Sequence, residues 1–246
     1  MSQPPRPPPP QILFQDEHLL AVNKPARMLS APGRGNTPTL ADWMREHAGL
    51  PDEPFRIVHR LDRDASGVIL FARTLSAQRR LVTQFSKREV EKVYIAVVSG
   101  FVEGDGEVNL NLGFDKNKKF VTVVKTGRGK TARTIYRVLK RLAGNTLVEC
   151  RPVTGRTHQI RVHMAAIGHP LTVDPDYGGG TAVLLSNFKP RYRLSGRHDE
   201  RPLIDRLTLH AARIEFRHPA DDRPMVLEAP LPKDLRATIT QLERQA

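Results

Sequence analysis

The spacing of hydrophobic and polar residues predicts alternating strands and helices in the first part of the chain. Short apolar runs at residues 18–25 and 67–73 have the length and composition of strands, and another follows at 93–100. Between these runs, apolar residues spaced three and four positions apart predict amphipathic helices at 39–48 and 76–90. This part of the chain therefore predicts helices packed beside strands.

Strand-like segments dominate the second part of the chain, and most of them follow one another without a helix between. They lie at residues 107–114, 120–125, 133–142, 145–153, 207–216 and 225–230. A helix is predicted at 157–168, where Gly168 and Pro170 end it, and another begins near Asp234. Because a parallel doubly wound sheet needs a helix after each strand, the pattern predicts an α+β fold. Its sheet is expected to be mixed, mostly antiparallel, with helices packed on it.

The composition of the chain narrows the class of protein. Six of the 20 prolines fall within the first ten residues, so residues 1–11 are predicted to be a disordered lead to a single domain at 12–246. No apolar stretch approaches the ~18 residues of a membrane helix, and the N-terminus lacks the apolar core of a signal peptide. Cys150 is the only cysteine, which excludes an internal disulfide. We therefore expect a cytoplasmic protein.

Positive charge is concentrated in one segment. The chain has 39 Lys and Arg against 26 Asp and Glu, a formal net charge of +13, and residues 115–141 carry ten basic residues and one acid. Because these cations are interleaved with β-branched residues on predicted strands, alternate side chains would form a basic ribbon on one face. The alternative is a solvated hairpin face. We expect phosphate contacts through Lys118, Lys119 and Lys125, and no membrane contact, because no basic amphipathic helix accompanies the cluster.

Two polar clusters interrupt otherwise apolar sequence and could carry chemistry. The first, at residues 58–72, places Asp62 and Asp64 in a charged turn before a predicted buried strand. A solvated surface turn is the alternative for such a cluster. A divalent metal would need further carboxylate or histidine ligands, and none is suitably spaced, so we expect no metal site.

The second polar cluster, at residues 151–170, surrounds a predicted helix. Thr154 or Thr157 is expected to cap this helix, which leaves Arg156 at its first turn. A cation is unfavourable there unless an anion lies nearby. Two histidines of the cluster are five residues apart rather than the four of a helical zinc pair, so a metal site is not expected here either.

Both clusters resemble signatures of the RluA-type pseudouridine synthases. HRLDRDASG at residues 59–67 is similar to that family's HRLDxxTSG motif, and GRTHQIRVH at 155–163 is similar to its second signature. Four flanking segments resemble further family motifs in the right order: NKPARMLSAPGR, VEKVYIAVV, GHPLTVDPDYGG and LTLHA, at residues 23–34, 90–98, 168–179 and 207–211. The resemblance covers residues 12–230 and implies the pseudouridine synthase catalytic fold, in a chain without room for the S4 RNA-binding domain of some members.

Two positions depart from the family pattern. Ala65 stands where the family usually has Thr, and we expect it to cost one hydroxyl hydrogen bond near the catalytic loop. Val173 stands where a Gly usually precedes Asp174, and we expect an altered turn.

The resemblance implies an isomerase that converts uridine in RNA to pseudouridine. The bond between C1′ and N1 breaks, the uracil turns and C5 joins C1′, which requires no cofactor, metal or redox change. Asp62 is implied to be the catalytic carboxylate, Arg156 its cationic partner, and Tyr94 the residue that stacks on uracil. Whether Asp62 adds covalently or removes a sugar proton stays open. Ile160 is implied to close the pocket with apolar surface, and Arg60 to fill the gap left by the flipped base.

The histidine and arginine neighbours of these residues receive supporting roles. His59 is expected to hold the catalytic loop rather than react, whereas Arg161 and His163 are expected to orient the helix or contact phosphate. The basic insert at 184–203 is a further candidate for substrate contact.

RNA is the expected partner, whether ribosomal, transfer or both, with no obligatory protein partner. A non-catalytic RNA-binding or RNA-chaperone protein on the same fold is the alternative, and the joint presence of Asp62, Tyr94 and Arg156 argues against it. A metal-dependent nuclease is a second alternative, which would need clustered acids that the sequence lacks.

Overall fold

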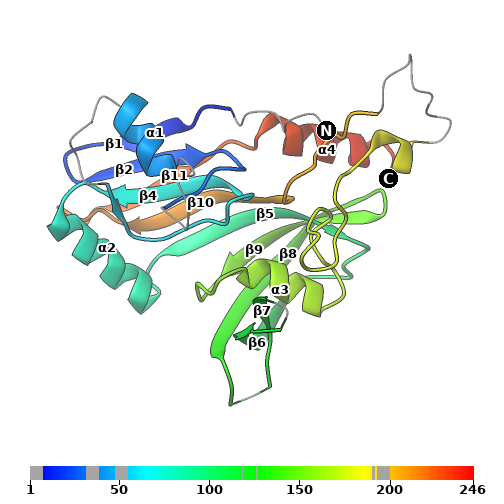
Figure 1. Cartoon of the computed structure of the whole chain (residues 1–246), viewed down its shortest axis with the longest axis horizontal. Helices are drawn as coiled ribbons and strands as arrows, with labels where there is room; N and C mark the ends of the chain where they lie inside the picture. Colours follow the sequence, from blue (N-terminus) through cyan, green and yellow to red (C-terminus); the bar gives the residue numbers. More distant parts are fainter. Residues whose placement is uncertain are drawn as a thin grey trace. The chain divides into compact units, whose positions relative to one another are not determined.

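The computed structural model describes residues 8–31, 39–47, 55–117, 119–125, 127–189, 192 and 200–246. The chain divides into two compact units (Figure 1). Unit 1 comprises Met1–Lys92 and Ala211–Pro230, and unit 2 comprises Val93–His210 and Leu231–Ala246. Most of the proline-rich lead, Lys118 and much of the basic insert lie outside the described residues. The single domain expected at 12–246 stays a prediction.

Unit 1 is built on an antiparallel sheet. Its strands are β1 (Gln11–Gln15), β2 (Leu19–Lys24), β3 (Arg56–Ile57), β4 (Ser66–Ala72), β11 (Pro224–Glu228) and the larger part of β10 (Leu209–Arg217). The order is β1-β2-β4-β10, with β3 beside β4 and β11 beside β10. Every residue of β4 is buried, as the apolar run predicted. Gly67 has φ +122, and a Cβ there would lie 2.2 Å from the carbonyl oxygen of Ala211, so the close passage of β4 and β10 requires glycine.

The two helices of unit 1 begin at capping residues. In α1 (Leu40–His47), the Thr39 hydroxyl accepts a hydrogen bond from the Asp42 N–H at 3.2 Å, and the Asp42 carboxylate accepts one from the Thr39 N–H at 2.8 Å. In α2 (Leu75–Lys87), the Thr74 hydroxyl accepts from the Ala77 N–H at 3.1 Å. Both predicted helices are confirmed to within a few residues.

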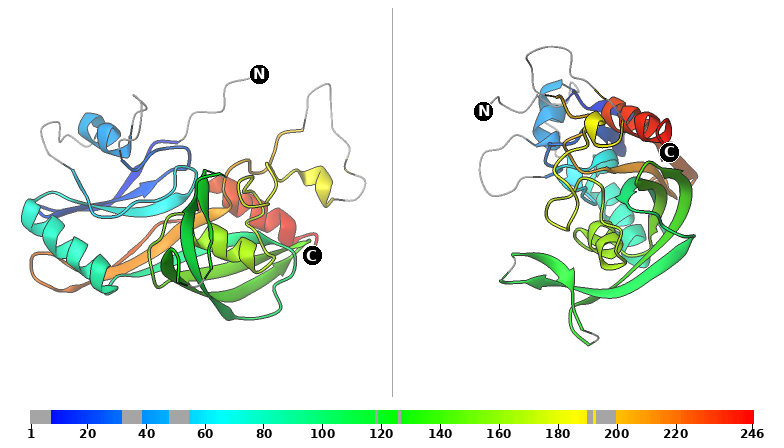
Figure 2. Two further views of the ribbon diagram at one scale, coloured as in Figure 1. Left: turned by 60° about the horizontal axis from the view of Figure 1, so that its bottom comes forward. Right: turned by 90° about the vertical axis from the view of Figure 1, so that its right-hand side faces the viewer.

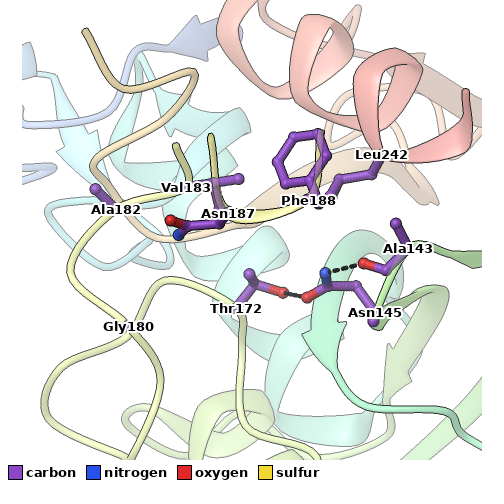
Figure 3. A pocket seen from close by; sticks show the side chains of 10 residues that line it. Ala143, Asn145, Thr172, Gly180, Ala182, Val183, Asn187, Phe188 and Leu242 are labelled. Atoms are coloured by element: carbon purple, nitrogen blue, oxygen red, sulfur yellow. Dashed lines mark hydrogen bonds between the residues drawn. The ribbon is translucent and has the colours of Figure 1, made fainter. Parts of the chain in front are cut away.

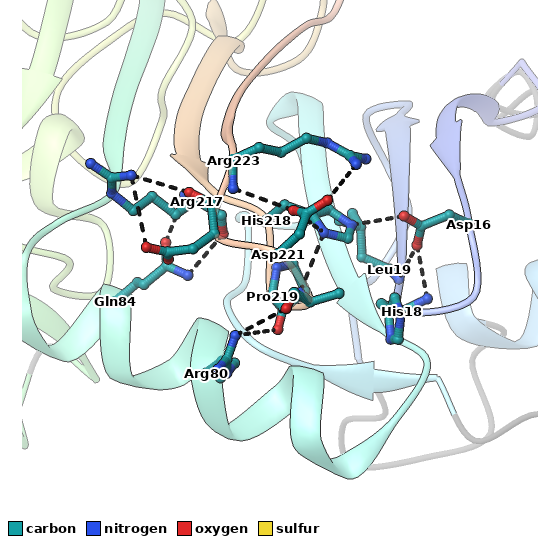
Figure 4. Close-up of polar contacts among 12 residues, drawn as sticks. Asp16, His18, Leu19, Arg80, Gln84, Arg217, His218, Pro219, Asp221 and Arg223 are labelled. Carbon is teal, nitrogen blue, oxygen red and sulfur yellow. Dashed lines mark hydrogen bonds and ion pairs between the residues drawn. The ribbon is translucent and has the colours of Figure 1, made fainter.

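A polar cluster ties three parts of unit 1 together (Figure 4). The Nε2 atom of buried His218, at the turn between β10 and β11, lies 2.7 Å from the Asp16 carboxylate at the turn between β1 and β2. Gln84 of α2 donates to the carbonyl of Arg217 and accepts from its N–H, both at 2.8 Å. Burial alone would raise the pKa of Asp16, but hydrogen bonds from His18, Leu19 and His218 hold it below its ordinary value.

Unit 2 is built on a second antiparallel stretch of sheet with its own helices. Its strands are β5 (Glu91–Ser99), β6 (Gly106–Asp115), β7 (Phe120–Val123), β8 (Lys130–Leu142) and β9 (Asn145–Pro152), and its helices are α3 (Gln159–Ala166), α4 (Lys233–Glu243) and the short 3₁₀ turn η1 (Leu185–Asn187). The order is β5-β9-β8-β6-β7, so β7 lies at the end of the sheet (green in Figure 2). Helix α3 packs against β6, β7, β8 and β9. One core cluster joins Val97 and Leu142 to α4, and another joins Leu112 and Ala132 to Val162 of α3.

The fold class follows the prediction. Every strand pairing whose register is described is antiparallel, and the helices are not interleaved strand by strand. This confirms an α+β fold. None of the described helices is long and apolar enough to cross a membrane.

Candidate active site

Asp62 lies in the loop between β3 and β4, and a buried lysine holds the backbone of this loop. Lys24 is 0% exposed, and its ammonium group donates hydrogen bonds to the carbonyl oxygens of Pro25 and Met28 at 2.9 Å and of Arg63 at 3.0 Å. A buried ammonium is tolerated only when its donors are used, and here three carbonyls receive them. The residue after Asp62 is therefore fixed to the end of β2.

The residue before Asp62 is fixed as well. The Ser30 hydroxyl donates to the carbonyl of Leu61 at 3.0 Å and accepts from its N–H at 3.2 Å. The carbonyl of Asp62 accepts from the N–H of Ala65 at 3.2 Å, which closes the turn. Ala65 is 1% exposed, so the position that departs from the family pattern is filled by a buried methyl group. Asp62 itself is half-buried on this anchored backbone.

His59 ties its loop to β4 and α2. Its Nε2 atom accepts a hydrogen bond from the N–H of Leu70 at 3.0 Å, and its ring stacks on Phe85 with centroids 4.7 Å apart. Burial, with a smaller contribution from the positive charge of Lys92, lowers the pKa of His59 to about 3. Burial likewise lowers the pKa of Lys92 to about 8. His59 is therefore neutral at neutral pH and accepts a backbone hydrogen bond.

Arg60 lies on the same loop with a different environment. Its side chain is exposed, whereas the neighbouring Leu61 is 8% exposed and packs inward. The loop thus presents two cations to solvent beside Asp62, Arg60 and Arg63.

Tyr94 lies on β5 in unit 2, half-buried. It pairs across the sheet with Cys150 of β9, which pairs in turn with Tyr136 of β8. Burial, followed by the charge of Glu149, raises the pKa of the Cys150 thiol to about 12. Cys150 is therefore a buried thiol without nucleophilic character.

Arg156 lies three residues before α3, and a buried glutamine organises the turn in which it lies. The Gln159 Oε1 atom accepts from the Arg156 N–H at 3.0 Å and from the Thr154 hydroxyl at 2.6 Å. Its Nε2 atom donates to the Arg133 carbonyl and to the Thr134 hydroxyl, both at 2.9 Å. All four hydrogen bonds of this amide are thus used at 4% exposure.

The predicted threonine cap of this helix is wrong. The N-cap residue is His158, in the left-handed region with φ 54, and its side chain makes no capping bond. The Thr154 hydroxyl instead accepts from the Arg133 N–H at 3.0 Å and donates to Gln159. Arg156 therefore precedes the helix rather than lying in its first turn, and its Nε donates to the carbonyl of Thr131 at 3.0 Å.

The remaining residues of the second signature hold α3 in place. Arg161 is 5% exposed and donates two hydrogen bonds of 2.7 Å to Asp174 and one of 2.7 Å to Asp176. The Nδ1 atom of His163 lies 2.9 Å from the Thr134 hydroxyl, and burial lowers the pKa of His163 to about 4. Of the two roles expected for Arg161 and His163, these contacts support orientation of the helix. Ile160 is 5% exposed on the same helix.

The loop that follows α3 is tied to the helix start and to β7. The Tyr177 hydroxyl lies 2.9 Å from Nδ1 of His158, and the Tyr177 ring packs edge-to-face on Phe120 with centroids 5.2 Å apart. Val173, the second departure from the family pattern, is 2% exposed and belongs to the core of unit 2.

Acids from outside residues 115–141 form ion pairs with part of the basic segment. Arg133 pairs with Glu107 at 2.6 Å, Arg137 with Glu149 at 3.5 Å and Lys140 with Glu243. These acids come from strands and a helix that the count of charges within 115–141 did not include. Within residues 115–141, the exposed cations without an ion pair to another described residue are Lys116, Lys119, Lys125, Arg128, Lys130 and Arg141. The unneutralised charge therefore lies mainly around the hairpin of β6 and β7.

The predicted site residues belong to both units. Arg60 and Asp62 share the loop of unit 1, whereas Tyr94, Arg156 and Ile160 belong to unit 2. The pairing of Asp62 with Arg156 stays a prediction, and so does the absence of a cofactor and a metal.

A pocket of about 410 Å³ in unit 2 contains none of these residues (Figure 3). Phe188 and Leu242 form part of its wall. Polar groups that line the pocket are hydrogen-bonded to one another. The Thr172 hydroxyl donates to Asn145 at 2.8 Å, and Asn145 donates to the carbonyl of Ala143 at 2.6 Å.

The family described as RNA pseudouridylate synthase matches residues 18–166, which include both the Asp62 loop and the turn of Arg156. The chain therefore belongs to the RNA pseudouridylate synthase family. It is similar to ribosomal large subunit pseudouridine synthase D of Nitrosomonas europaea, with 40% identity over 93% of this chain and 64% of the relative. It is also similar to the protein of the same name in Neisseria meningitidis serogroup B, with 38% identity over 96% of this chain and 62% of the relative.

The chain thus spans less than two thirds of the length of these two curated relatives. Among solved structures it resembles human RNA pseudouridylate synthase domain containing 1, with a TM-score of 0.70 and 27% identity over 91% of this chain and 84% of that one. This likeness confirms the fold that the sequence motifs implied.

Proposed function

We propose that this chain is an RNA pseudouridine synthase that isomerises specific uridines, and that Asp62 is its catalytic carboxylate. Family membership over residues 18–166 supports the reaction class. The observation that carries the assignment of Asp62 is its anchored loop, in which Lys24 and Ser30 fix the residues on either side. A carboxylate that must act at one carbon atom gains from such prior positioning, because its orientation need not be fixed during the reaction.

In the proposed mechanism, the carboxylate of Asp62 acts at the ribose of the target uridine, either by adding to it or by removing a proton. Arg156 is the proposed cationic partner of the Asp62 carboxylate. Tyr94 stacks on the uracil, which stays bound after the C1′–N1 bond breaks and turns before C5 joins C1′. C5 then loses its proton to water and N1 gains one, so the overall reaction is an isomerisation. Ile160 supplies apolar surface to the base pocket. The exposed Arg60 enters the space that the flipped base leaves in the RNA.

Ribosomal RNA is the substrate that we propose, because the two relatives described above are named for the large ribosomal subunit. No observation favours transfer RNA in addition. We also propose a cytoplasmic location for the enzyme.

The reaction is tested by release of tritium from RNA that carries 5-tritiated uridine. We expect Asp62→Asn to abolish release while RNA binding and the cooperativity of unfolding are retained. Asp64→Asn, in the same loop two residues away, is the matched control and should keep most of the activity. Tritium release by the Asp62→Asn variant would refute the assignment, and absence of release by the wild-type protein would favour the RNA-chaperone alternative. Cleavage of RNA that EDTA abolishes would favour a nuclease.

The hairpin cations are proposed to bind RNA phosphates. We expect Lys119→Gln and Lys125→Gln together to lower the slope of log affinity against log salt by roughly 0.7 to 0.9 per lost phosphate contact. Arg137→Gln is the control, since Arg137 is already paired with Glu149. Lys118 belongs to the same proposal. An unchanged slope in the double variant would show that the RNA binds elsewhere.

A further inference from the structure

Two phenylalanines near the turn between β6 and β7 have opposite environments. Phe120 is half-buried, and its ring packs on Tyr177, which anchors the hairpin to the rest of unit 2. Phe114 is 65% exposed, more than any other large hydrophobic residue among those described. A single exposed aromatic residue is common on protein surfaces, so its exposure alone indicates no function. The position of Phe114 is what points to a function.

Phe114 lies where the apolar face of β6 emerges from beneath α3. Leu112, two residues earlier and so on the same face, is 3% exposed and packs with Val162 of α3. Phe114 continues this face beyond the cover of the helix. Val121 of β7 lies directly opposite it. The exposed ring therefore lies two residues beyond the part of β6 that packs against α3.

Unpaired cations lie on the segments next to this ring. Lys130 lies opposite Leu112 on β8 and is thus a diagonal neighbour of Phe114 on the same face. Lys116 and Lys119 lie in the adjoining turn, and Lys125 follows β7. None of these four makes an ion pair with another described residue.

The surface also continues toward a residue of the proposed active site. The Nε atom of Arg156 donates to the carbonyl of Thr131, the residue next to Lys130. One edge of unit 2 thus carries Arg156, a row of free cations and an exposed aromatic ring.

We propose that Phe114 is a stacking platform for an unpaired base of the RNA substrate, held between the phosphate contacts of the hairpin cations. This proposal rests on the proposed function and adds that the RNA bound beside the target uridine is single-stranded. Free cations attract the backbone of any nucleic acid, whereas an exposed aromatic ring selects bases that are free to stack. A fully paired duplex offers no such base.

The experiment compares the binding of Phe114→Ala to a stem-loop RNA containing the target uridine and to a perfect duplex of matched length. Stacking on one base predicts a loss of about 5- to 150-fold on the stem-loop. We expect no change on the duplex. The salt slope should also stay unchanged, because no phosphate contact is removed.

Phe114→Trp should keep or strengthen binding to the stem-loop. In a Trp43→Phe background, which removes the chain's only other indole, fluorescence of the Phe114→Trp variant should be quenched by the stem-loop and not by the duplex.

The matched control is Phe101→Ala. Phe101 is 57% exposed, close to the exposure of Phe114, but its neighbours in the turn are the exposed acids Glu103 and Asp105. We expect this variant to bind both RNAs like the wild type.

Equal affinities of the two alanine variants for the stem-loop would overturn the inference, and so would equal losses of Phe114→Ala on stem-loop and duplex. A change of oligomeric state in Phe114→Ala, measured by analytical ultracentrifugation, would also overturn it by showing that the ring contacts a second copy of the chain. The proposed function fails separately, if the wild-type protein releases no tritium.

Discussion

The ammonium group of Lys24 lies 3.0 Å from the carbonyl oxygen of Arg63, 39 residues later in the chain. This bond joins the end of β2 to the residue after Asp62. Two hydrogen bonds between the Ser30 hydroxyl and the Leu61 backbone hold the residue before Asp62. The asparagine-lysine-proline segment and the aspartate motif, which are separate patterns in the sequence, are therefore parts of one structural element. In the proposed mechanism, Lys24 is therefore a positioning residue for the Asp62 loop.

We expect Lys24→Met to destabilise the protein by about 2 to 4 kcal/mol, because the methionine side chain fills the space but leaves buried carbonyls without donors. The measurement is urea unfolding. Lys87→Met, at the exposed end of α2, is the control and should cost at most about 1 kcal/mol. Under conditions where Lys24→Met is folded, kcat for tritium release should fall at least ~10-fold with KM for RNA nearly unchanged, since a displaced Asp62 affects the reaction more than binding. Equal changes in KM and kcat would contradict a positioning role.

The hydrogen bonds of Gln159 lead to a second prediction, about the stability of the turn that carries Arg156. Gln159→Leu keeps the approximate shape of the side chain but leaves the Arg133 carbonyl and the Arg156 N–H without their partner. We expect a loss of about 2 to 4 kcal/mol in the free energy of unfolding. Activity should fall as well, because the turn that carries Arg156 is released. Gln241→Leu in α4 is the control, since the Gln241 side chain makes no hydrogen bond to another described residue. Stability like that of the control would show that water replaces the amide.

Strand and helix positions were predictable from sequence because they depend on local spacing. The buried run at 67–73 became β4, and the segment at 76–90 became α2 with its cap at Thr74. Candidate site residues were found only through their resemblance to family motifs. No periodicity distinguishes Asp62 from Asp64.

The roles of Lys24 and Gln159 could not be predicted, because each bonds to a residue far away in the sequence, Arg63 for Lys24 and Arg133 for Gln159. The cap of α3 failed for a related reason, since Thr154 bonds to Arg133, 21 residues earlier. The charge count of the basic segment likewise could not show that Glu149 of β9 lies directly opposite Arg137 of the adjacent strand β8. A lysine within an apolar run and a glutamine within an apolar helix were the only local signals.

Gly67 tests the close passage of two strands in unit 1. Gly67→Ala would place a Cβ 2.2 Å from the Ala211 carbonyl oxygen at φ +122, where both the contact and the backbone angle oppose a side chain. We expect a loss of more than about 3 kcal/mol in stability, or failure to fold. Gly104→Ala is the control, because a Cβ there meets nothing within 4 Å. Circular dichroism and thermal unfolding measure both variants. A thermal midpoint for Gly67→Ala within a few degrees of the control would show that β4 and β10 can separate at no great cost.

His59 predicts the pH dependence of stability. Its pKa falls from 6.5 to about 3 on burial, so the folded protein keeps it neutral while the unfolded chain takes up a proton below about pH 6.5. Protonation of the unfolded chain therefore destabilises the fold progressively as pH decreases, and the penalty reaches its limit below about pH 3. Between pH 7 and pH 5 this one residue should account for about 2 kcal/mol of lost stability.

In His59→Gln, whose amide oxygen can still accept from the Leu70 N–H, urea unfolding at pH 7, 6 and 5 should show a decline smaller by that amount. His163→Gln should remove a similar share, because the pKa of His163 falls to about 4. Parallel declines in the wild type and the His59→Gln variant would mean that His59 becomes protonated within the folded protein, and its role as a neutral acceptor for the Leu70 N–H would then be wrong.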